Sequence, residues 1–256
     1  MNENGEQNAG VPVIVDMEKI IDAYEALKIA RKRQPVIKIP LPMKRIKFED
    51  KREVKNNESY KLENGILTIN EARTQQKYEF MNNEKILKVV VGENVGFDNP
   101  FWQCVSEGRF KGCINLQCFD FTGVEEISKY AFAGCKKLTL KADDLIELLT
   151  IGDSAFEGCE AIEGRLNFNG EVKIGANAFK DTNLREVYIV GETDAEKKAE
   201  IVEAFKDFED LSFYFSNNCW GLRAILDRKL LSYNAIVGRI KLYYREGGEY
   251  KKYNIK

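Results

Sequence analysis

The stretch Ile127-Ser-Lys-Tyr-Ala-Phe132-Ala-Gly-Cys135-Lys-Lys-Leu138-Thr-Leu140 returns in altered form along the chain. One further copy reads Ile151-Gly-Asp-Ser-Ala-Phe156-Glu-Gly-Cys159, and another reads Ile174-Gly-Ala-Asn-Ala-Phe179. Looser copies keep Phe110-Lys-Gly-Cys113 on one side and Ala204-Phe205 on the other. The five phenylalanines are 22, 24, 23 and 26 residues apart. Self-similarity at this period predicts a solenoid of stacked repeats.

The apolar content of one repeat explains why the repeats must stack. A unit of this length has too few apolar residues to enclose a core. Its Ile, Ala, Phe, Cys and Leu positions must therefore pack against their equivalents in the next repeat. The motif I-G-x-x-A-F-x-G-C-x-x-L, followed by a short apolar strand, resembles the BspA-like class of leucine-rich repeats. The match is closest over residues 127–190 and looser over 95–126 and 191–216.

The resemblance implies a curved array lined by strands that recognises proteins through its concave strand face. Bacterial surface proteins are among the members of this class. We therefore expect a fold of the α+β class that leans to β, a leucine-rich-repeat solenoid with short strands lining one sheet. An N-terminal helix and a C-terminal hairpin are expected to cap it.

Three regions follow along the chain. Residues 1–58 are predicted to hold a disordered start, a helix and an extended N-terminal cap. Residues 59–216 form the predicted solenoid, and residues 217–256 a C-terminal cap with a helix and a hairpin. The N-terminal helix, expected over 16–33 from apolar residues at helical spacing, is interpreted as a lid over the open end of the repeats. The alternative is a helix that docks a partner.

Local signals add detail to these regions. Asn64-Gly65 between two apolar runs predicts a tight hairpin, and Gly247-Gly248 predicts another near the end of the chain. The second hairpin should pair Ile240 with Ile255 and Leu242 with Tyr253. Thr193-Asp-Ala-Glu196 fits a capping box and predicts a short helix in the last repeat.

The candidate binding surface follows from the strand that ends each repeat. In each strand two apolar residues flank one other residue. Alternation at period two buries the flanking residues and exposes the central one. Stacking the repeats aligns the central residues in a row, with a second row beside it. We interpret these rows as the protein-binding surface: Asp120, Thr139, Asn167, Tyr188 and Tyr214 in the first, and Arg165, Glu186 and Ser212 in the second.

Tyr188 and Tyr214 are the leading candidates in these rows. An exposed tyrosine supplies broad contact area and a hydrogen bond at low entropic cost, and tyrosine is enriched in interface cores. The alternative is that both residues only favour strand formation through cross-strand packing. The sequence leaves the two interpretations open.

The composition excludes several classes of chemistry. The chain has no histidine, which removes every catalytic or metal site that depends on one. Cys113, Cys135 and Cys159 occupy the same position of successive repeats and are interpreted as buried free thiols. A metal site would have to use Cys104, Cys113 and Cys118, whose spacings of nine and five residues lack the C-x-x-C step of a zinc site. We therefore expect no catalytic residue, no metal and no cofactor.

Charge is distributed unevenly along the chain. Residues 61–216 carry 18 Lys and Arg against 28 Asp and Glu, a net charge of −10, whereas residues 217–256 carry 9 against 3, a net charge of +6. A face that binds phosphates needs its cations on the array itself. We therefore expect a protein partner and no nucleic acid.

The N-terminal residues bear on location. Met1-Asn-Glu-Asn-Gly-Glu-Gln-Asn8 lacks the positive and apolar segments of a secretory signal. As written, the sequence therefore predicts a cytoplasmic protein without membrane insertion. If the chain is trimmed from a longer one, the resemblance predicts the cell surface or secretion instead.

Three functions compete at this point. The leading hypothesis is a non-enzymatic module that binds a protein through the concave strand face. The second is a structural or assembly protein, such as a surface-associated adhesin, that self-associates through its terminal caps. The third is an enzyme that uses carboxylates or a cysteine, for which Asp120 and Glu186 are the only exposed acids expected on one face.

Overall fold

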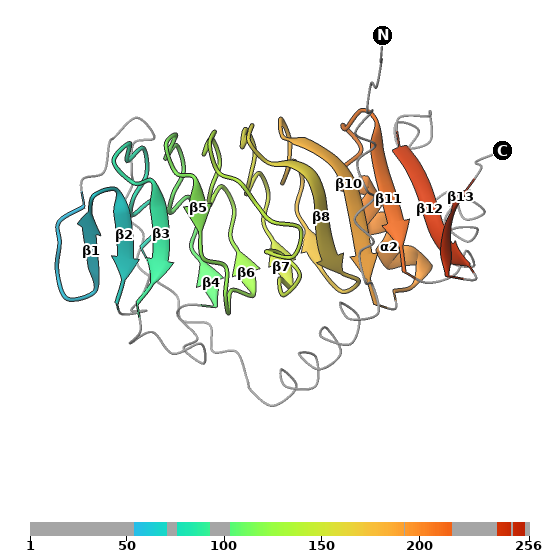
Figure 1. Ribbon diagram of the computed structural model, residues 1–256, viewed down its shortest axis with the longest axis horizontal. Coiled ribbons are helices and arrows are strands. Elements are labelled where there is room, and N and C mark those ends of the chain that lie inside the picture. The colour runs from blue at the N-terminus through green and yellow to red at the C-terminus, as the bar shows by residue number, and fades with distance from the viewer. Residues whose placement is uncertain are drawn as a thin grey trace, which may run out of the picture.

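Repeats lie side by side along the long axis of the molecule (Figure 1). The structure is a computed structural model that describes residues 54–70, 76–92, 103–191, 193–216, 240–246 and 248–253. Within these ranges the chain forms a solenoid of short strands with a single helix, as the period of the phenylalanines predicts. The predicted N-terminal helix and the C-terminal residues 217–239 lie outside the described residues.

Two sheets run along one side of the solenoid. The N-terminal sheet has the strand order β1-β2-β3-β5, and the C-terminal sheet has the order β13-β12-β11-β10-β8. Neighbouring strands are parallel except in the two hairpins, β1 with β2 and β12 with β13. The strands are β1 (Tyr60–Glu63), β2 (Ile66–Ile69), β3 (Lys88–Val91), β5 (Cys118–Phe119), β8 (Glu163–Asn169), β10 (Asn183–Val190), β11 (Leu211–Phe215), β12 (Ile240–Glu246) and β13 (Glu249–Tyr253).

The structure also has a third sheet, made of short strands, so the prediction of a single sheet was wrong. It pairs four two-residue strands in parallel, in the order β4-β6-β7-β9. Each strand ends in the apolar residue that opens a repeat motif, such as Ile127 or Ile151. That residue packs into the core while its backbone bonds to the next repeat. The strands are β4 (Cys104–Val105), β6 (Glu126–Ile127), β7 (Thr150–Ile151) and β9 (Lys173–Ile174).

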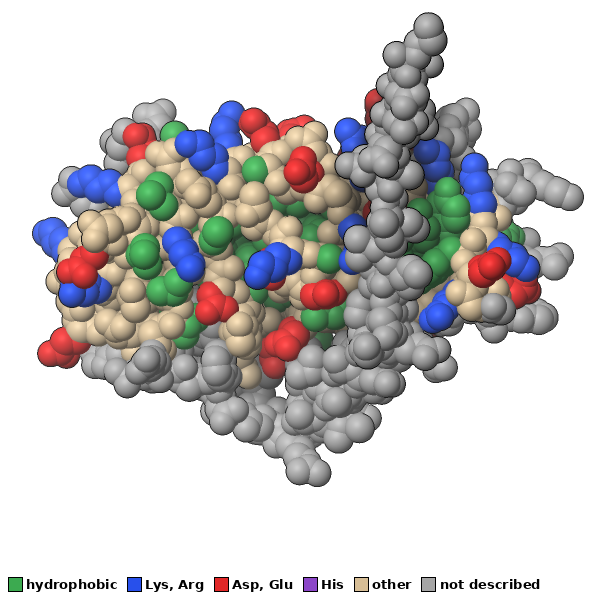
Figure 2. All heavy atoms as spheres, in the orientation of Figure 1, with side chains coloured by type: hydrophobic (Ala, Val, Ile, Leu, Met, Phe, Trp, Pro, Cys, Tyr) green, Lys and Arg blue, Asp and Glu red, His purple; other side chains and the backbone are tan. Residues whose placement is uncertain are grey.

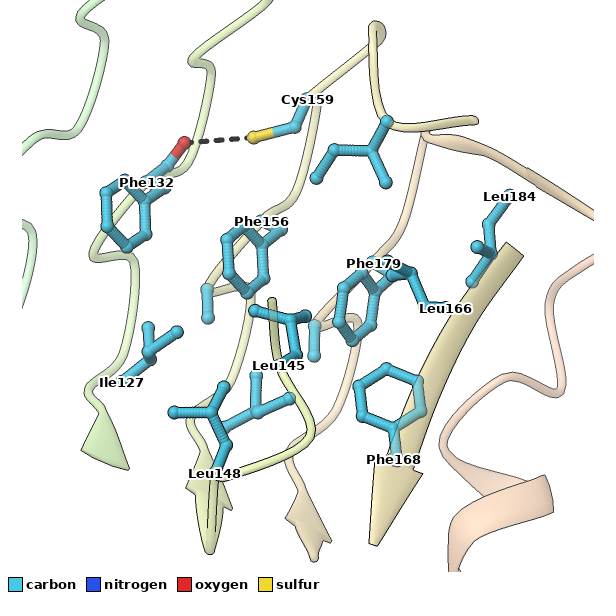
Figure 3. Packing of buried hydrophobic residues seen from close by; sticks show 14 of the residues in the cluster. Ile127, Phe132, Leu145, Leu148, Phe156, Cys159, Leu166, Phe168, Phe179 and Leu184 are labelled. Carbon is cyan, nitrogen blue, oxygen red and sulfur yellow. Dashed lines mark hydrogen bonds between the residues drawn. The ribbon is translucent and has the colours of Figure 1, made fainter. Parts of the chain in front are cut away.

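A column of phenylalanine rings forms the interior, as predicted. The rings of Phe110, Phe132, Phe156, Phe179 and Phe205 stack in sequence, with centroids 5.1 to 5.5 Å apart. Figure 3 shows three of these rings in register, with Leu145 and Leu148 packed beside them. Phe80 adds a sixth ring, 5.4 Å from Phe110, which the sequence analysis missed. All six side chains are at most 1 % exposed.

The motif cysteines form a second column beside the rings. The thiol of Cys159 donates a hydrogen bond to the carbonyl of Phe132, as the dashed line in Figure 3 shows, at 3.1 Å. Cys113 and Cys135 bond in the same way, at the same distance, to carbonyls of the preceding repeats. All three thiols are free and buried, which confirms their interpretation as buried free thiols.

In the turns of the first five rings, from Phe80 to Phe179, two residues have left-handed backbone angles. They lie two positions before and two positions after the phenylalanine, as with Tyr130 (φ 60°) and Gly134 (φ 75°) around Phe132. Glycine adopts this conformation without steric cost. The glycine of the F-x-G-C motif therefore serves the backbone of the turn, which lets the chain reverse direction within a few residues.

The predicted local elements are found with one shift. Asn64 and Gly65 (φ 49° and 81°) form the turn of the β1–β2 hairpin, and Leu242 pairs with Tyr253 in the β12–β13 hairpin. Ile255, the predicted partner of Ile240, lies outside the described residues. Helix α2 (Ala195–Glu203) begins one residue later than the capping box implied, because Asp194, not Thr193, accepts the hydrogen bond from the backbone of Lys197. Among the described residues, no helix has the length and hydrophobicity needed to cross a membrane.

Candidate protein-binding surface

The C-terminal sheet aligns residues of the two predicted rows across its strands. In the strand register, Arg165 of β8 lies opposite Glu186 of β10, and Glu186 lies opposite Ser212 of β11. In the neighbouring row Tyr188 pairs with Tyr214. The parallel register brings these five side chains together on one face of the sheet, because the alternating residues between them turn into the core.

The prediction that Asn167 is exposed was wrong. The residue pairs with Tyr188 as expected, yet its side chain is fully buried. Its amide nitrogen donates to the carboxylate of Asp143 at 2.5 Å, and its backbone N–H donates to the carbonyl of Ala142 at 2.7 Å. The segment 141–147 therefore packs against this edge of the C-terminal sheet and removes Asn167 from the accessible face.

Asp120 and Thr139 lie on the other side of that segment. The expected strand around Thr139 is not formed, although its backbone N–H bonds to the carbonyl of Gln117 at 3.0 Å. Both residues line a groove of about 540 Å³ between β3, β5 and the segment 139–147. The predicted row is thus divided into a groove over the N-terminal sheet and a surface on the C-terminal sheet.

The groove is bordered by carboxylates. Asp120, Asp143, Asp144 and Glu147 line it together with two lysines and apolar residues of β3 and β5. Burial raises the pKa of the Asp144 carboxyl, and the negative charges of Asp143 and Asp120 add to this effect. On the face in Figure 2, side chains of both charge signs are interspersed with hydrophobic ones, so no single charge dominates it.

A stack of tyrosines distinguishes the C-terminal sheet. The tyrosine ladder consists of Tyr188, Tyr214 and Tyr243, one from each of β10, β11 and β12. Ring centroids are 4.3 Å apart between the first two and 4.6 Å apart between the last two, with planes tilted by 11° and 10°. These short spacings arise because the parallel register places the residues directly beside one another.

Two further side chains hold the ladder in place. Tyr250 of β13 meets Tyr188 and Tyr214 nearly at right angles, with centroids 5.8 and 5.2 Å away. The guanidinium of Arg165 lies over the other end of the ladder, 5.2 Å from the Tyr188 centroid, at a distance suited to a cation–π contact. The ladder is therefore fixed at its edge and at one end before any partner binds.

The electrostatics of the ladder keep its hydroxyls protonated. Burial raises the pKa of Tyr188 and of Tyr214 to about 12, and the carboxylate of Glu186 adds to both shifts. Burial also raises the pKa of Tyr250. At neutral pH these phenols are hydrogen-bond donors as well as acceptors. The surface can therefore satisfy polar groups of a partner while burying its apolar atoms.

Comparison with known families agrees with the repeats. The model of the BspA type leucine rich repeat region matches residues 76–211 in six copies. The chain belongs to the BspA-type leucine-rich repeat family. The six copies fit the column of six rings that begins at Phe80. No curated protein and no solved structure matches the chain.

The BspA-type array carries two surface residues that the sequence analysis did not connect to the rows. Tyr243 and Tyr250 were expected in the hairpin, yet their contacts with Tyr188 and Tyr214 depend on the parallel pairing of β12 with β11. The residues before β12 carry no repeat motif, so nothing in the sequence indicated how β12 would align with β11. The periodic tyrosines of β10 and β11 were the only indication that a third would follow.

Proposed function

We propose that this BspA-type protein is a non-enzymatic interaction module that binds a protein partner through the strand face of its C-terminal sheet. The tyrosine ladder is the observation that carries the proposal. Its half-buried rings are already ordered by Arg165 and Tyr250, so binding would cost little side-chain entropy. Solenoids commonly use such extended strand faces for recognition.

The surface has the composition of an interface core. Tyrosine and arginine are enriched in such cores, and their truncation often dominates binding energy. Glu186 and Ser212 complete the surface with polar groups next to the ladder. These residues suit a concave binding face better than an active site, because the described residues place no activated nucleophile beside them.

Removal of the ladder tests the proposal. The double variant Tyr188→Ala/Tyr214→Ala is compared with the wild type as immobilised bait, and retained proteins are quantified by mass spectrometry. The matched control is Ile114→Ala/Leu149→Ala, which removes two exposed hydrophobic side chains from positions outside this sheet. Specific partners should be lost from the ladder variant and kept by the control. Retention of every partner by a folded ladder variant would refute the proposal.

Self-association through the terminal caps is the competing assembly function. The strongest observation that bears on it is the edge of β1, where the side chain of Asn56 bonds to both backbone groups of Leu62. That contact blocks strand addition at this end. Light scattering of the full chain at high concentration decides between the two functions, since an assembly protein should form multimers without any partner.

A further inference from the structure

The tyrosine ladder offers its ring edges, and not its ring faces, to a partner. Tyr214 has Tyr188 on one face and Tyr243 on the other, at 4.3 and 4.6 Å. The second face of Tyr188 is covered by the guanidinium of Arg165. Ligands that bind by stacking on aromatic faces, such as nucleobases, find these two rings occupied. What remains open are hydroxyls and ring edges.

Ring edges and phenol hydroxyls favour an anion. The quadrupole of an aromatic ring makes its edge positive, and the protonated hydroxyls can donate hydrogen bonds to carboxylates.

Cations without carboxylate partners flank the ladder. Arg165 lies at its β8 end, and Arg245 and Lys252 lie on the β12–β13 hairpin, with Lys252 paired opposite Tyr243. Within the described part of the chain, none of the three forms an ion pair. The neighbouring lysines differ, since Lys241 pairs with Asp210 at 2.8 Å and Lys251 pairs with Glu246 at 2.5 Å.

This local charge is opposite to that of the array. Residues 61–216 carry a net charge of −10, and the groove over the N-terminal sheet is lined by Asp120, Asp143, Asp144 and Glu147. On the ladder surface, Glu186 is one carboxylate against the three flanking cations. An acidic partner would therefore be repelled by the groove and attracted to the ladder, which sets where it binds.

We propose that the partner of the C-terminal sheet is an acidic protein segment whose carboxylates are bound by Arg165, Arg245 and Lys252 on either side of the tyrosine ladder. This inference rests on the proposed function and specifies its partner. Nucleic acid supplies anions too, yet its bases have no free ring face on Tyr188 or Tyr214 to stack on.

A labelled peptide tests the partner class directly. A fluorescein-labelled peptide of twelve glutamates is titrated with the full chain and followed by anisotropy at low and at high salt. Peptides of twelve glutamines and twelve lysines, and a twelve-nucleotide oligothymidine, serve as comparison probes. The glutamate peptide should bind best, and its affinity should fall with added salt because the contacts are between exposed charges.

Two charge-matched variants locate the binding. Arg165→Gln/Arg245→Gln/Lys252→Gln removes the flanking cations, and Lys55→Gln/Lys85→Gln/Lys173→Gln removes the same charge from other parts of the molecule. The first should weaken binding of the glutamate peptide about tenfold, as expected for three solvent-exposed charge pairs. The second should change it little. Equal losses in the two variants would overturn the inference, because they would show attraction to overall charge alone.

The remaining outcomes separate this inference from the proposed function. If the ladder variant loses its specific protein partners while the glutamate peptide does not bind the wild type, the binding face stands and the acidic partner is wrong. If oligothymidine binds more tightly than the peptide, the partner class is nucleic acid and the inference is overturned. If the wild type self-associates and the variant without the flanking cations does not, the surface binds a second copy of the chain. That result would also overturn the inference.

Discussion

The guanidinium of Arg109 contacts the carboxylate of Glu79 through two nitrogens, each 2.9 Å from the same oxygen, inside the first two repeats. Both residues directly precede the ring of their repeat, Phe80 or Phe110. Four later repeats have alanine at this position, so a buried ion pair here replaces a methyl contact. Desolvation lowers the pKa of Arg109, and the charge of Glu79 opposes that shift.

Breaking this pair should destabilise the protein strongly. Arg109→Ala leaves the carboxylate of Glu79 without its partner in a largely buried site, which should cost about 3 kcal/mol of unfolding free energy. The double variant Glu79→Ala/Arg109→Ala matches the later repeats and should recover most of that loss. Urea denaturation measures both. Lys136→Ala, which breaks an exposed pair with Glu160, is the control and should cost less than about 1 kcal/mol. A double variant as unstable as the single one would contradict the prediction.

The turn glycines should tolerate asparagine better than alanine. Gly158 has a φ of 72°, and the equivalent position of the first repeat is Asn82, with a φ of 56°. Alanine there should cost about 1 to 2 kcal/mol, because its Cβ meets the carbonyl in a left-handed backbone. Gly158→Asn should cost clearly less, since asparagine adopts this conformation more readily. Thermal denaturation ranks the variants, and equal losses would show that lack of space, not backbone angle, selects glycine.

The period of the phenylalanines was enough to predict the core. Phe132, Phe156 and Phe179 stack in one column because each belongs to a repeat with the same turn and the same strand. Phe80 escaped detection because its copy lacks the glycine and the cysteine of the motif and lies thirty residues before Phe110. Asn82 was a weak indication of a turn of the same kind after Phe80, because asparagine tolerates a left-handed backbone angle.

The division of the predicted rows into a groove and a separate surface could not be predicted from the spacing of the repeats. The repeat from Phe132 to Phe156 is hardly longer than its neighbours, yet the segment 141–147 leaves the strand path and packs beside β8. The side chains of Leu145, within the segment, and Leu148, just after it, are buried in the core. The side-chain amide of Asn167 donates a hydrogen bond to the carboxylate of Asp143. Such a contact depends on which side chains meet in three dimensions, which the motif alignment does not contain.

The buried thiols should make stability fall at alkaline pH. Burial raises the pKa of Cys159 to about 12, whereas an unfolded cysteine ionises near 8.5. The stabilising contribution is complete below the unfolded pKa and is lost as the pH rises toward 12, because only the unfolded state releases the proton. Between pH 9 and pH 10 the wild type should lose about 1 kcal/mol more than Cys159→Ala. Parallel pH profiles for the two proteins would contradict this.

The same burial should protect the thiols from modification. In a Cys104→Ser/Cys219→Ser background, a thiol reagent at pH 8 should label Cys118, which is exposed, within minutes. Cys113, Cys135 and Cys159 should react only after denaturant is added, since reaction requires an accessible thiolate. Mass spectrometry of labelled peptides assigns the sites. Rapid labelling of Cys135 in the folded protein would show that the repeats open locally.

Asn56 should keep the first strand from pairing with another molecule. Its side-chain oxygen accepts from the backbone N–H of Leu62 at 2.7 Å, and its amide donates to the carbonyl of the same residue. Asn56→Ala frees both groups at the edge of β1 and should increase self-association at high concentration. Asn115→Ala is the control, because its side chain donates to the carbonyl of Glu84, away from β1. Light scattering that finds both variants equally monomeric would show that the edge is protected by other means.

Alkaline titration should reveal the order of the tyrosine ladder. Burial holds the pKa of Tyr188 and Tyr214 near 12, so the phenolate absorbance of these two residues should appear only in strongly alkaline solution. Subtracting the titration of Tyr188→Phe/Tyr214→Phe from that of the wild type should leave a component that rises only above about pH 11. In guanidinium chloride the same difference should shift to about pH 10, the value of an unfolded tyrosine. A difference already centred near pH 10 in the folded protein would mean that the two rings are open to water, and the preordered surface on which the proposed partner binding rests would be absent.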